Sequence, residues 1–484
     1  MNIQWPQIIM AIVYMAALVV IGLIMSRRIK SSDDYWVGGR SVGPISTAIS
    51  YCAAYYSTVA IVGAVPLYYM YGIGYHALET IGCIFFTGVI IFIFVGVRMR
   101  AISERVGAVS LPGFLANRFD CNTIRLLGGL VIAFMAIPYA VSVLKGIADA
   151  MTAIAGIPYI VGVLALALVA LFYLVSSGYW GVATTDLIQG ITIAVAVFVL
   201  AAVGVVKAGG VSNIFATINE QDASLLSMPG PLSWAQIFSY AWVWALIAFG
   251  QPQLTTKFMG LKDGRTMKTV VRASVIWMFI FAVANMLVAG SARVIYGGAI
   301  SENIDLLAPQ MALDVGGIGI SGIFLCGAIA AGLSTLVALV LTSSSAVCKD
   351  IVEDYAAIKK GSKSNVDSVK FSRIVTAIIF VISIALAIRP WDFVWSMSTM
   401  AAGAMGSAFT APMILGLYWK RATKEGCIAS VVGGCLVAVV WYLLGLTDLI
   451  HSFVPGTLAG FVLMVVVSLM TKPMDEKKLA LYFG

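Results

Sequence analysis

Two short stretches hold the polar groups that could do chemistry in an otherwise apolar chain. In AIAAGLSTLVALVLTSSSAVCKD (328–350), Ala331, Ser334 and Thr335 stand at positions i, i+3 and i+4 and therefore share one helical face. In ISYCAAYYSTVAIVG (49–63), small residues, hydroxyls and phenols interrupt an apolar segment. Polar groups in hydrocarbon are costly unless other groups satisfy them. We therefore expect both stretches to face an ion or a cavity.

The chemistry that these residues could do is cation binding. Two hydroxyl oxygens and a carbonyl from the hydroxyl-rich turn make three hard ligands, and a partly unwound segment at 53–56 could supply two more carbonyls. Hard oxygens without a carboxylate suit a weakly bound monovalent cation, of which sodium is the obvious candidate. The Ser334–Thr335 pair alone indicates little, because hydroxyls in membrane helices often bond to their own backbone.

The composition shows what kind of element must position these groups. The chain has 484 residues, of which 61% are hydrophobic and 11% are charged; a soluble domain averages about 25% charged residues. The mean hydropathy is +0.99, so we expect an all-α integral membrane protein. Apolar segments near the ~20 residues of a spanning helix recur along the chain. Thirteen are expected, at 5–26, 43–73, 77–97, 126–155, 157–176, 184–207, 234–256, 273–292, 317–348, 374–389, 393–418, 427–446 and 453–471.

The basic residues predict the orientation in the membrane. If the N-terminus is outside, all but four of the 30 Lys and Arg residues fall in loops on one side of the membrane. Lys257 is one of the residues assigned to these loops. The positive-inside rule assigns that side to the cytoplasm, so the C-terminus is expected inside. The net charge of +8 is thereby explained without a nucleic-acid partner. The expected location is the cell's inner (plasma) membrane, crossed many times.

The chain offers little for catalysis and no soluble domain to house it. It has no Ser/His/Asp set, no phosphate-binding loop and no metal cluster, and the seven cysteines lack zinc-like spacing. We therefore expect no enzyme. A second interrupted helix is predicted at FGQPQ (249–253), where proline removes a backbone donor beside a glycine. Two interruptions, each opening a run of five expected helices, are typical of transporters built from inverted repeats. The alternative is an ordinary proline kink with a small-residue packing face.

Four stretches together resemble the sodium:solute symporter family. They are DDYWVGGRSVGP (33–44), TTDLIQG (184–190), FGQPQLTTKFMGLKD (249–263) and GLSTLVALVLTSSSAVCKD (332–350). The resemblance runs from about residue 30 to 420 and implies the leucine-transporter fold, in which two inverted five-helix repeats form the core. The implied organisation is a first helix and loop at 1–42, repeats at 43–207 and 234–418, an outer loop at 208–233, and two C-terminal helices with a tail at 419–484.

The resemblance also implies a sodium site and a coupling residue. Asp186 matches the family's acidic residue of the sixth helix; the alternative is a carboxylate at a helix end that bonds to Thr184 or Thr185. Where relatives with a second sodium site have hydroxyls, this chain has Val337 and Ala338, so one sodium per solute is expected. The implied sodium ligands are the carbonyls of Ala53, Tyr56 and Ala331 and the hydroxyls of Ser334 and Thr335.

The same comparison predicts the residues around the solute. Tyr139 and Trp244 match positions that contact substrate in the family; without that resemblance, aromatic core packing would be the favoured explanation. Tyr55 and Ala248 depart from the proline-transporting members, which have an aspartate and an aromatic residue there, and this casts doubt on proline itself. Glu79 matches a sugar-contacting glutamate of the galactose-transporting member. The cavity is completed by Tyr55, Ser57, Glu79 and Gln251.

Lys145 and Asp149 form a further candidate pair in the outer half of the fourth helix. They stand four residues apart on one face. Lys145 could contact a carboxylate of the solute, or the two side chains could neutralise each other at the outer interface.

These features predict sodium-coupled uptake of a small polar solute by alternating access. An amino acid or short carboxylate is expected; the alternatives are a sugar, a polyol or a pantothenate-like vitamin, or a membrane sensor with the same fold. The 13 residues after Thr471 are too few for a fused kinase domain, which disfavours the sensor. The expected partners are the solute, sodium and the lipid bilayer, with no nucleic acid. The sequence leaves the oligomeric state open, a monomer included.

Overall fold

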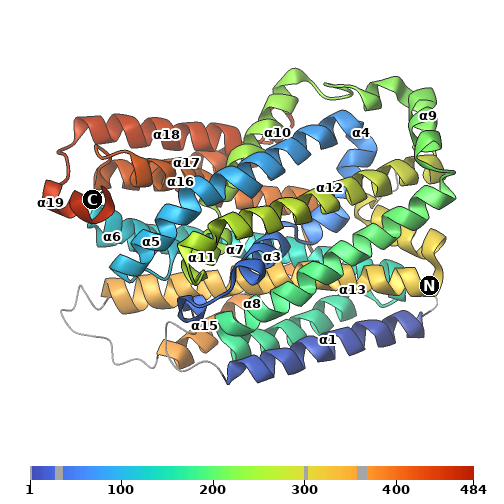
Figure 1. Ribbon diagram of the computed structural model, residues 1–484, viewed down its shortest axis with the longest axis horizontal. Coiled ribbons are helices and arrows are strands. Elements are labelled where there is room, and N and C mark those ends of the chain that lie inside the picture. The colour runs from blue at the N-terminus through green and yellow to red at the C-terminus, as the bar shows by residue number, and fades with distance from the viewer. Residues whose placement is uncertain (1–2, 28–35, 299–302, 357–367, 484) are drawn as a thin grey trace.

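The computed structural model describes residues 3–27, 36–298, 303–356 and 368–483. Within these ranges the chain is helical, apart from loops and one isolated bridge between Val42 and Leu261, and the all-α prediction is confirmed. The helices (Figure 1) are α1 (Trp5–Ser26), α3 (Pro44–Tyr55), α4 (Ala64–Ile81), α5 (Val97–Val106), α6 (Leu111–Phe119), α7 (Asn122–Ala155), α8 (Tyr159–Lys207), α9 (Val211–Asp222), α10 (Trp234–Leu246), α11 (Pro252–Gly260), α12 (Met267–Tyr296), α13 (Leu307–Ser345), α15 (Ser368–Ala387), α16 (Val394–Tyr418), α17 (Lys424–Leu443), α18 (Phe453–Met470) and α19 (Glu476–Phe483).

Nine helical runs of the described residues are long and apolar enough to cross a membrane. Three shorter apolar helices accompany them, at Tyr159–Leu171, Trp234–Gly250 and Ile374–Ala387. The run Val59–Val106 is divided at Gly72, whose φ of 82° no other residue type adopts easily. Every segment expected from the sequence therefore contains a helix. The number of membrane crossings stays a prediction.

Several helix boundaries differ from the expected ones. The fifth and sixth segments lie in one helical run, α8. The helix α13 begins before the expected 317–348, and a turn at Gly317 (φ 59°) separates its first part from the rest. The outer loop and the tail contain helices α9 and α19, which hydropathy alone did not predict because both are short and amphipathic.

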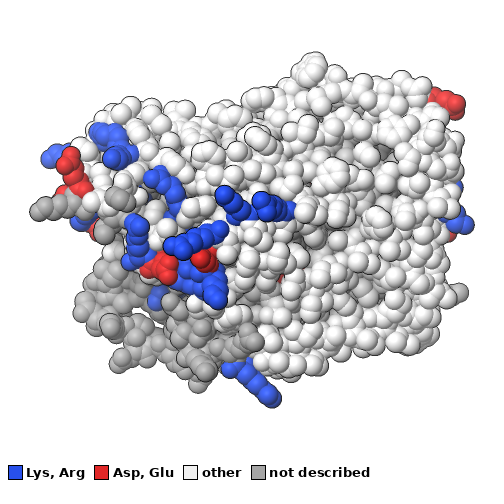
Figure 2. All heavy atoms as spheres, viewed as in Figure 1, with Lys and Arg blue, Asp and Glu red and all other residues white. Residues whose placement is uncertain are grey.

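The two ends of the molecule differ in charge, and each carries one terminus of the chain. The N- and C-termini lie at opposite ends in Figure 1. On the face drawn in Figure 2, Lys and Arg gather at the end that carries the C-terminus, α5 and α6. The positive-inside rule associates such an end with the cytoplasm; the orientation of the termini in the membrane stays a prediction.

The helix α13 is the central element of the fold. Nearly all of its residues from Ser321 to Ser345 are buried, and it packs against α7 and α8 along its length. The peripheral α1 covers α8 and α13, while α16, α17 and α18 pack on one another. Because α13 has no lipid-facing side over this stretch, its hydroxyls can only meet other helices or internal space.

Candidate functional site

The helix α3 stops in the middle of the protein, as the sequence predicted. Its last backbone bond runs from the Tyr56 N–H to the Cys52 carbonyl at 2.8 Å, and Tyr56 then leaves the helical region with ψ 70°. The helix resumes as a π-helical segment, Val59–Gly63, and just before it the Ser57 hydroxyl accepts a hydrogen bond from the Val59 N–H at 3.1 Å. The carbonyls of Ala53 and Ala54 therefore lie beyond the backbone ladder and need other partners.

The hydroxyls of α13 meet these carbonyls. Ser334 Oγ lies 3.0 Å from the carbonyl oxygens of both Ala53 and Ala331. Thr335 Oγ1 donates to the Ala54 carbonyl at 3.2 Å. Both side chains are buried, with exposed fractions of 1% and 0%. The structure thus brings together four of the five predicted sodium ligands.

The fifth predicted ligand lies next to this group, and one further oxygen joins it. Tyr56 stands two residues after Ala54 as the residue that ends α3, with its ring packed on Phe281 at a centroid distance of 4.5 Å. The Ala54 carbonyl was not predicted, although it belongs to the same unwound turn. Hydroxyl and carbonyl oxygens without a carboxylate fit a monovalent hard cation. An ion between α3 and α13 would take the place of the hydroxyl-to-carbonyl bonds.

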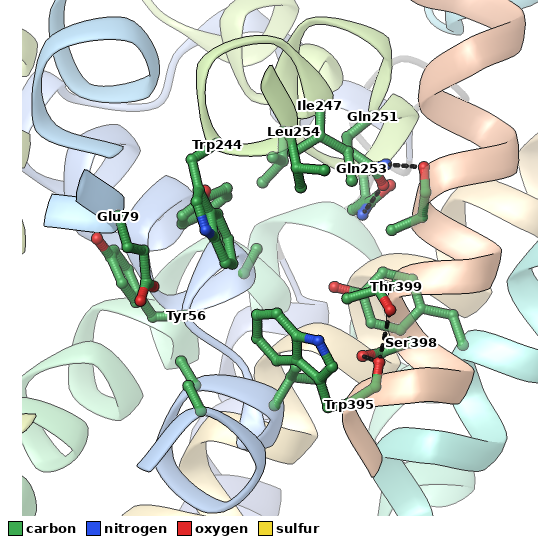
Figure 3. Close-up of a pocket in the computed structure, with 18 residues that line it drawn as sticks. Tyr56, Glu79, Trp244, Ile247, Gln251, Gln253, Leu254, Trp395, Ser398 and Thr399 are labelled. Atoms are coloured by element: carbon green, nitrogen blue, oxygen red, sulfur yellow. Dashed lines mark hydrogen bonds between the residues drawn. The ribbon is translucent and has the colours of Figure 1, made fainter. Parts of the chain in front are cut away.

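A cavity begins on the other side of the same unwound turn. It encloses about 620 Å³ of space, including the part that opens to solvent. Figure 3 shows Glu79 and Trp244 on one side of it and Ser398 and Thr399 of α16 on the other, with Trp395 between them. The lining residues are Ala54, Tyr55, Tyr56, Val59, Ala60, Ala64, Glu79, Tyr139, Val243, Trp244, Ile247, Gln251, Gln253, Leu254, Trp395, Ser398, Thr399 and Ala402.

Most of the predicted solute contacts line this cavity. Tyr55, Glu79, Tyr139, Trp244 and Gln251 do so. The sixth predicted residue, Ser57, does not line the cavity; its hydroxyl accepts a hydrogen bond from the Val59 N–H. Sequence reasoning missed the contribution of α16, whose signal was the hydroxyl-rich stretch SMST at 396–399.

The polar groups of the cavity are held by short hydrogen bonds. Gln251 Nε2 donates to the Ala402 carbonyl at 2.7 Å, and Gln253 Nε2 donates to Gln251 Oε1 at 2.8 Å. Glu79 accepts a hydrogen bond from the Tyr68 hydroxyl. The side-chain amides therefore link α11 to α16 across the cavity.

The second interrupted helix is also confirmed. The helix α10 ends at Leu246, a 3₁₀ turn follows at Ile247–Gly250, and α11 begins at Pro252. At Gly250 a Cβ would lie 2.5 Å from the Gly406 carbonyl oxygen. A glycine is needed there because the broken turn touches the backbone of α16.

Asp186 has a partner that the sequence did not suggest. Its Oδ2 accepts from Lys257 Nζ at 2.8 Å and from Ser50 Oγ at 2.6 Å. The hydroxyls of Thr184 and Thr185 instead donate to backbone carbonyls of their own helix. The prediction that Lys257 belongs to a cytoplasmic loop is wrong: the half-helix α11 continues to Gly260 inside the protein and buries this lysine.

Lys145 also lies in a cluster larger than the predicted pair. Its Nζ contacts Asp149 Oδ2 and Asp305 Oδ2, each at 2.6 Å. Asp305 Oδ2 additionally accepts from the Val394 N–H at 3.1 Å. Lys145 is not among the residues that line the cavity, and its charge is met by two carboxylates of the protein. This arrangement favours mutual neutralisation over a contact with the solute.

Comparison with known sequences gives the family. The model of the sodium:solute symporter family matches residues 35–434. The sodium/proline symporter of Salmonella typhimurium is 28% identical over 98% of this chain and 94% of its own length. The high-affinity proline transporter PutP of Bacillus subtilis is 26% identical over 94% of this chain and 96% of its own.

Comparison with solved structures gives the fold. A sodium-coupled sialic acid symporter in a substrate-bound outward-open state superimposes with a TM-score of 0.82 at 20% identity, over 98% of this chain and 100% of that one. Mhp1, a transporter of the nucleobase-cation-symport-1 family, in a closed conformation gives a TM-score of 0.54 at 13% identity, over 94% of this chain and 99% of that one. The predicted leucine-transporter-like fold is therefore confirmed, and the chain belongs to the sodium:solute symporter family.

Proposed function

We propose that sodium binds between the broken end of α3 and the hydroxyls of α13, and that the adjacent cavity binds the solute. The protein is a sodium-coupled transporter of a small solute, as its family and relatives show. The proposed ion ligands are the carbonyls of Ala53, Tyr56 and Ala331 with the hydroxyls of Ser334 and Thr335. The Ala54 carbonyl joins them because Thr335 already contacts it.

One observation carries this assignment. The single turn at 53–56 supplies the carbonyls that meet α13 and also the residues Ala54, Tyr55 and Tyr56 that line the cavity. An ion that fixes this turn therefore also shapes the solute site. Coupling of this kind is reciprocal: whatever sodium adds to solute affinity, the solute adds to sodium affinity. The membrane potential then contributes about 2.3 kcal/mol per charge per 100 mV to accumulation.

The cavity supports an amino acid as the solute. Of the described residues that line it, none is Lys or Arg, and Glu79 is the one carboxylate. A solute ammonium would be placed near Glu79, while a solute carboxylate would face the positive end of α11, whose cap residue Gln251 lines the cavity. The curated relatives transport proline, which carries both groups. The resemblance places Tyr55 where proline-transporting members of the family have an aspartate, so the panel below includes amino acids other than proline.

A thermal-shift screen of the purified protein in sodium and in potassium tests the proposal. The panel contains proline and other amino acids, short monocarboxylates, pantothenate, sialic acid, hexoses and inositol. The expected result is stabilisation by an amino acid in sodium but not in potassium, with the size set by the ligand's excess over its Kd. Equal stabilisation in both salts would contradict the sodium-coupled solute site. Stabilisation by a hexose alone would favour the sugar alternative.

A further inference from the structure

A second group of cation ligands lies one helical turn from the proposed sodium site, and it already holds a positive charge. Lys257 Nζ lies 2.8 Å from Asp186 Oδ2 and 2.7 Å from Ser50 Oγ. The side chains of Lys257 and Asp186 are 2% and 1% exposed. The ring of Tyr179 faces the ammonium at 5.4 Å. The cluster joins α3, α8 and α11, which belong to different halves of the fold.

The cluster is adjacent to the sodium site along two helices. Ser50 precedes Ala53 by three residues on α3, so the two lie on one face. On α8, Gly190 follows Asp186 by one turn, and a Cβ there would lie 3.6 Å from the Ala53 Cβ. Lys257 also lines a smaller cavity together with Ala338, which stands one turn after Ser334 on α13.

We propose that the ammonium of Lys257 is a tethered cation that fills a second cation site, formed by Asp186 and Ser50, and so limits transport to one sodium per solute. This inference rests on the proposed function. A carboxylate and a hydroxyl are hard oxygen ligands of the kind that sodium also takes. A lysine ammonium is a compact point charge with three donors, two of which meet these ligands.

The physical consequence concerns what happens when the lysine charge is removed. A buried carboxylate without a counter-charge is strongly disfavoured. Asp186 also has a second oxygen, Oδ1, that is buried and has no donor among the residues that the structure describes. Removing the lysine leaves Asp186 Oδ1, Asp186 Oδ2 and Ser50 Oγ around the vacated volume, beside a cavity. A free sodium ion is then expected to enter this volume.

Equilibrium binding of radioactive sodium to the purified full-length protein tests this directly and needs no solute. One ion per chain is expected for the wild type and two for Lys257→Ala. The double variant Lys257→Met/Asp186→Asn, which removes both charges, should return to one. Lys262→Ala is the matched control, because this lysine follows α11 but is exposed; it should bind one ion.

Each alternative outcome is distinguishable. One ion bound by folded Lys257→Ala, or two by the wild type, would overturn the tethered cation while leaving sodium coupling intact. No sodium bound by the wild type would instead contradict the proposed function. If Lys257→Ala is unstable, its melting temperature is measured in sodium and in potassium. Sodium is expected to raise the melting temperature of Lys257→Ala more than it raises that of the wild type. An identical response of both proteins would overturn the inference.

Discussion

Replacing Ser334 by alanine should weaken sodium binding far more than it weakens the fold. The hydroxyl contacts two carbonyl oxygens at 3.0 Å, one on α3 and one on α13, and we assign it as a direct ligand. Interactions of a polar group with a charge contribute about 1.5–3 kcal/mol. Since about 1.4 kcal/mol corresponds to a factor of ten, the sodium concentration for half-maximal uptake should rise about 10- to 150-fold. Maximal uptake at saturating sodium should change much less.

The sodium concentration for half-maximal uptake is measured in proteoliposomes. Uptake is followed at increasing sodium, with the solute found in the screen held at a fixed concentration. Ser383→Ala is the matched control: its hydroxyl is also buried, but it donates at 2.9 Å to the Ile379 carbonyl of its own helix. It should leave the sodium dependence unchanged. If Ser334→Ala and Ser383→Ala give the same sodium curve as the wild type, the hydroxyl is a packing group and the ion site lies elsewhere.

Three further perturbations follow from the geometry. Glu79→Gln should weaken solute binding about tenfold or more if the solute is an amino acid, because the carboxylate meets the ammonium; a titration in saturating sodium measures this, and an unchanged Kd would place the ammonium elsewhere. Asp305→Asn should lower the melting temperature, since Lys145 loses one of its two carboxylates; equal melting of both proteins would contradict a stabilising cluster. Gly72→Ala should destabilise the fold by at least about 1 kcal/mol, because its φ of 82° and ψ of −169° suit only glycine and a Cβ would lie 2.2 Å from the Leu225 carbonyl oxygen; wild-type stability would refute this.

The local features of the site could be predicted because they depend on spacing within one helix. The i, i+3, i+4 pattern of Ala331, Ser334 and Thr335 placed them on one face, and the small polar stretch at 53–56 indicated a break. That these two segments contact each other was predicted only from the family resemblance. The Ala54 carbonyl was missed because the rotation of a helix end depends on packing that spacing does not record.

The charge clusters could not be predicted, because their members are distant in sequence. Lys257 and Asp186 are 71 residues apart, and Lys145 and Asp305 are 160 apart. Lys257 was assigned to a loop since hydropathy cannot distinguish a charge in water from one paired inside the bundle. A buried ion pair is visible only once both helices are placed.

The short turn at Ala53–Tyr56, which faces the proposed sodium site on one side and the cavity on the other, has a consequence for inhibition. A molecule that binds in the cavity but is too large for the helices to close around it would hold this turn in its ion-bound shape. It would block transport without competing with sodium. Its potency should therefore increase with external sodium, and such a compound would be selective for cells that face a high-sodium medium.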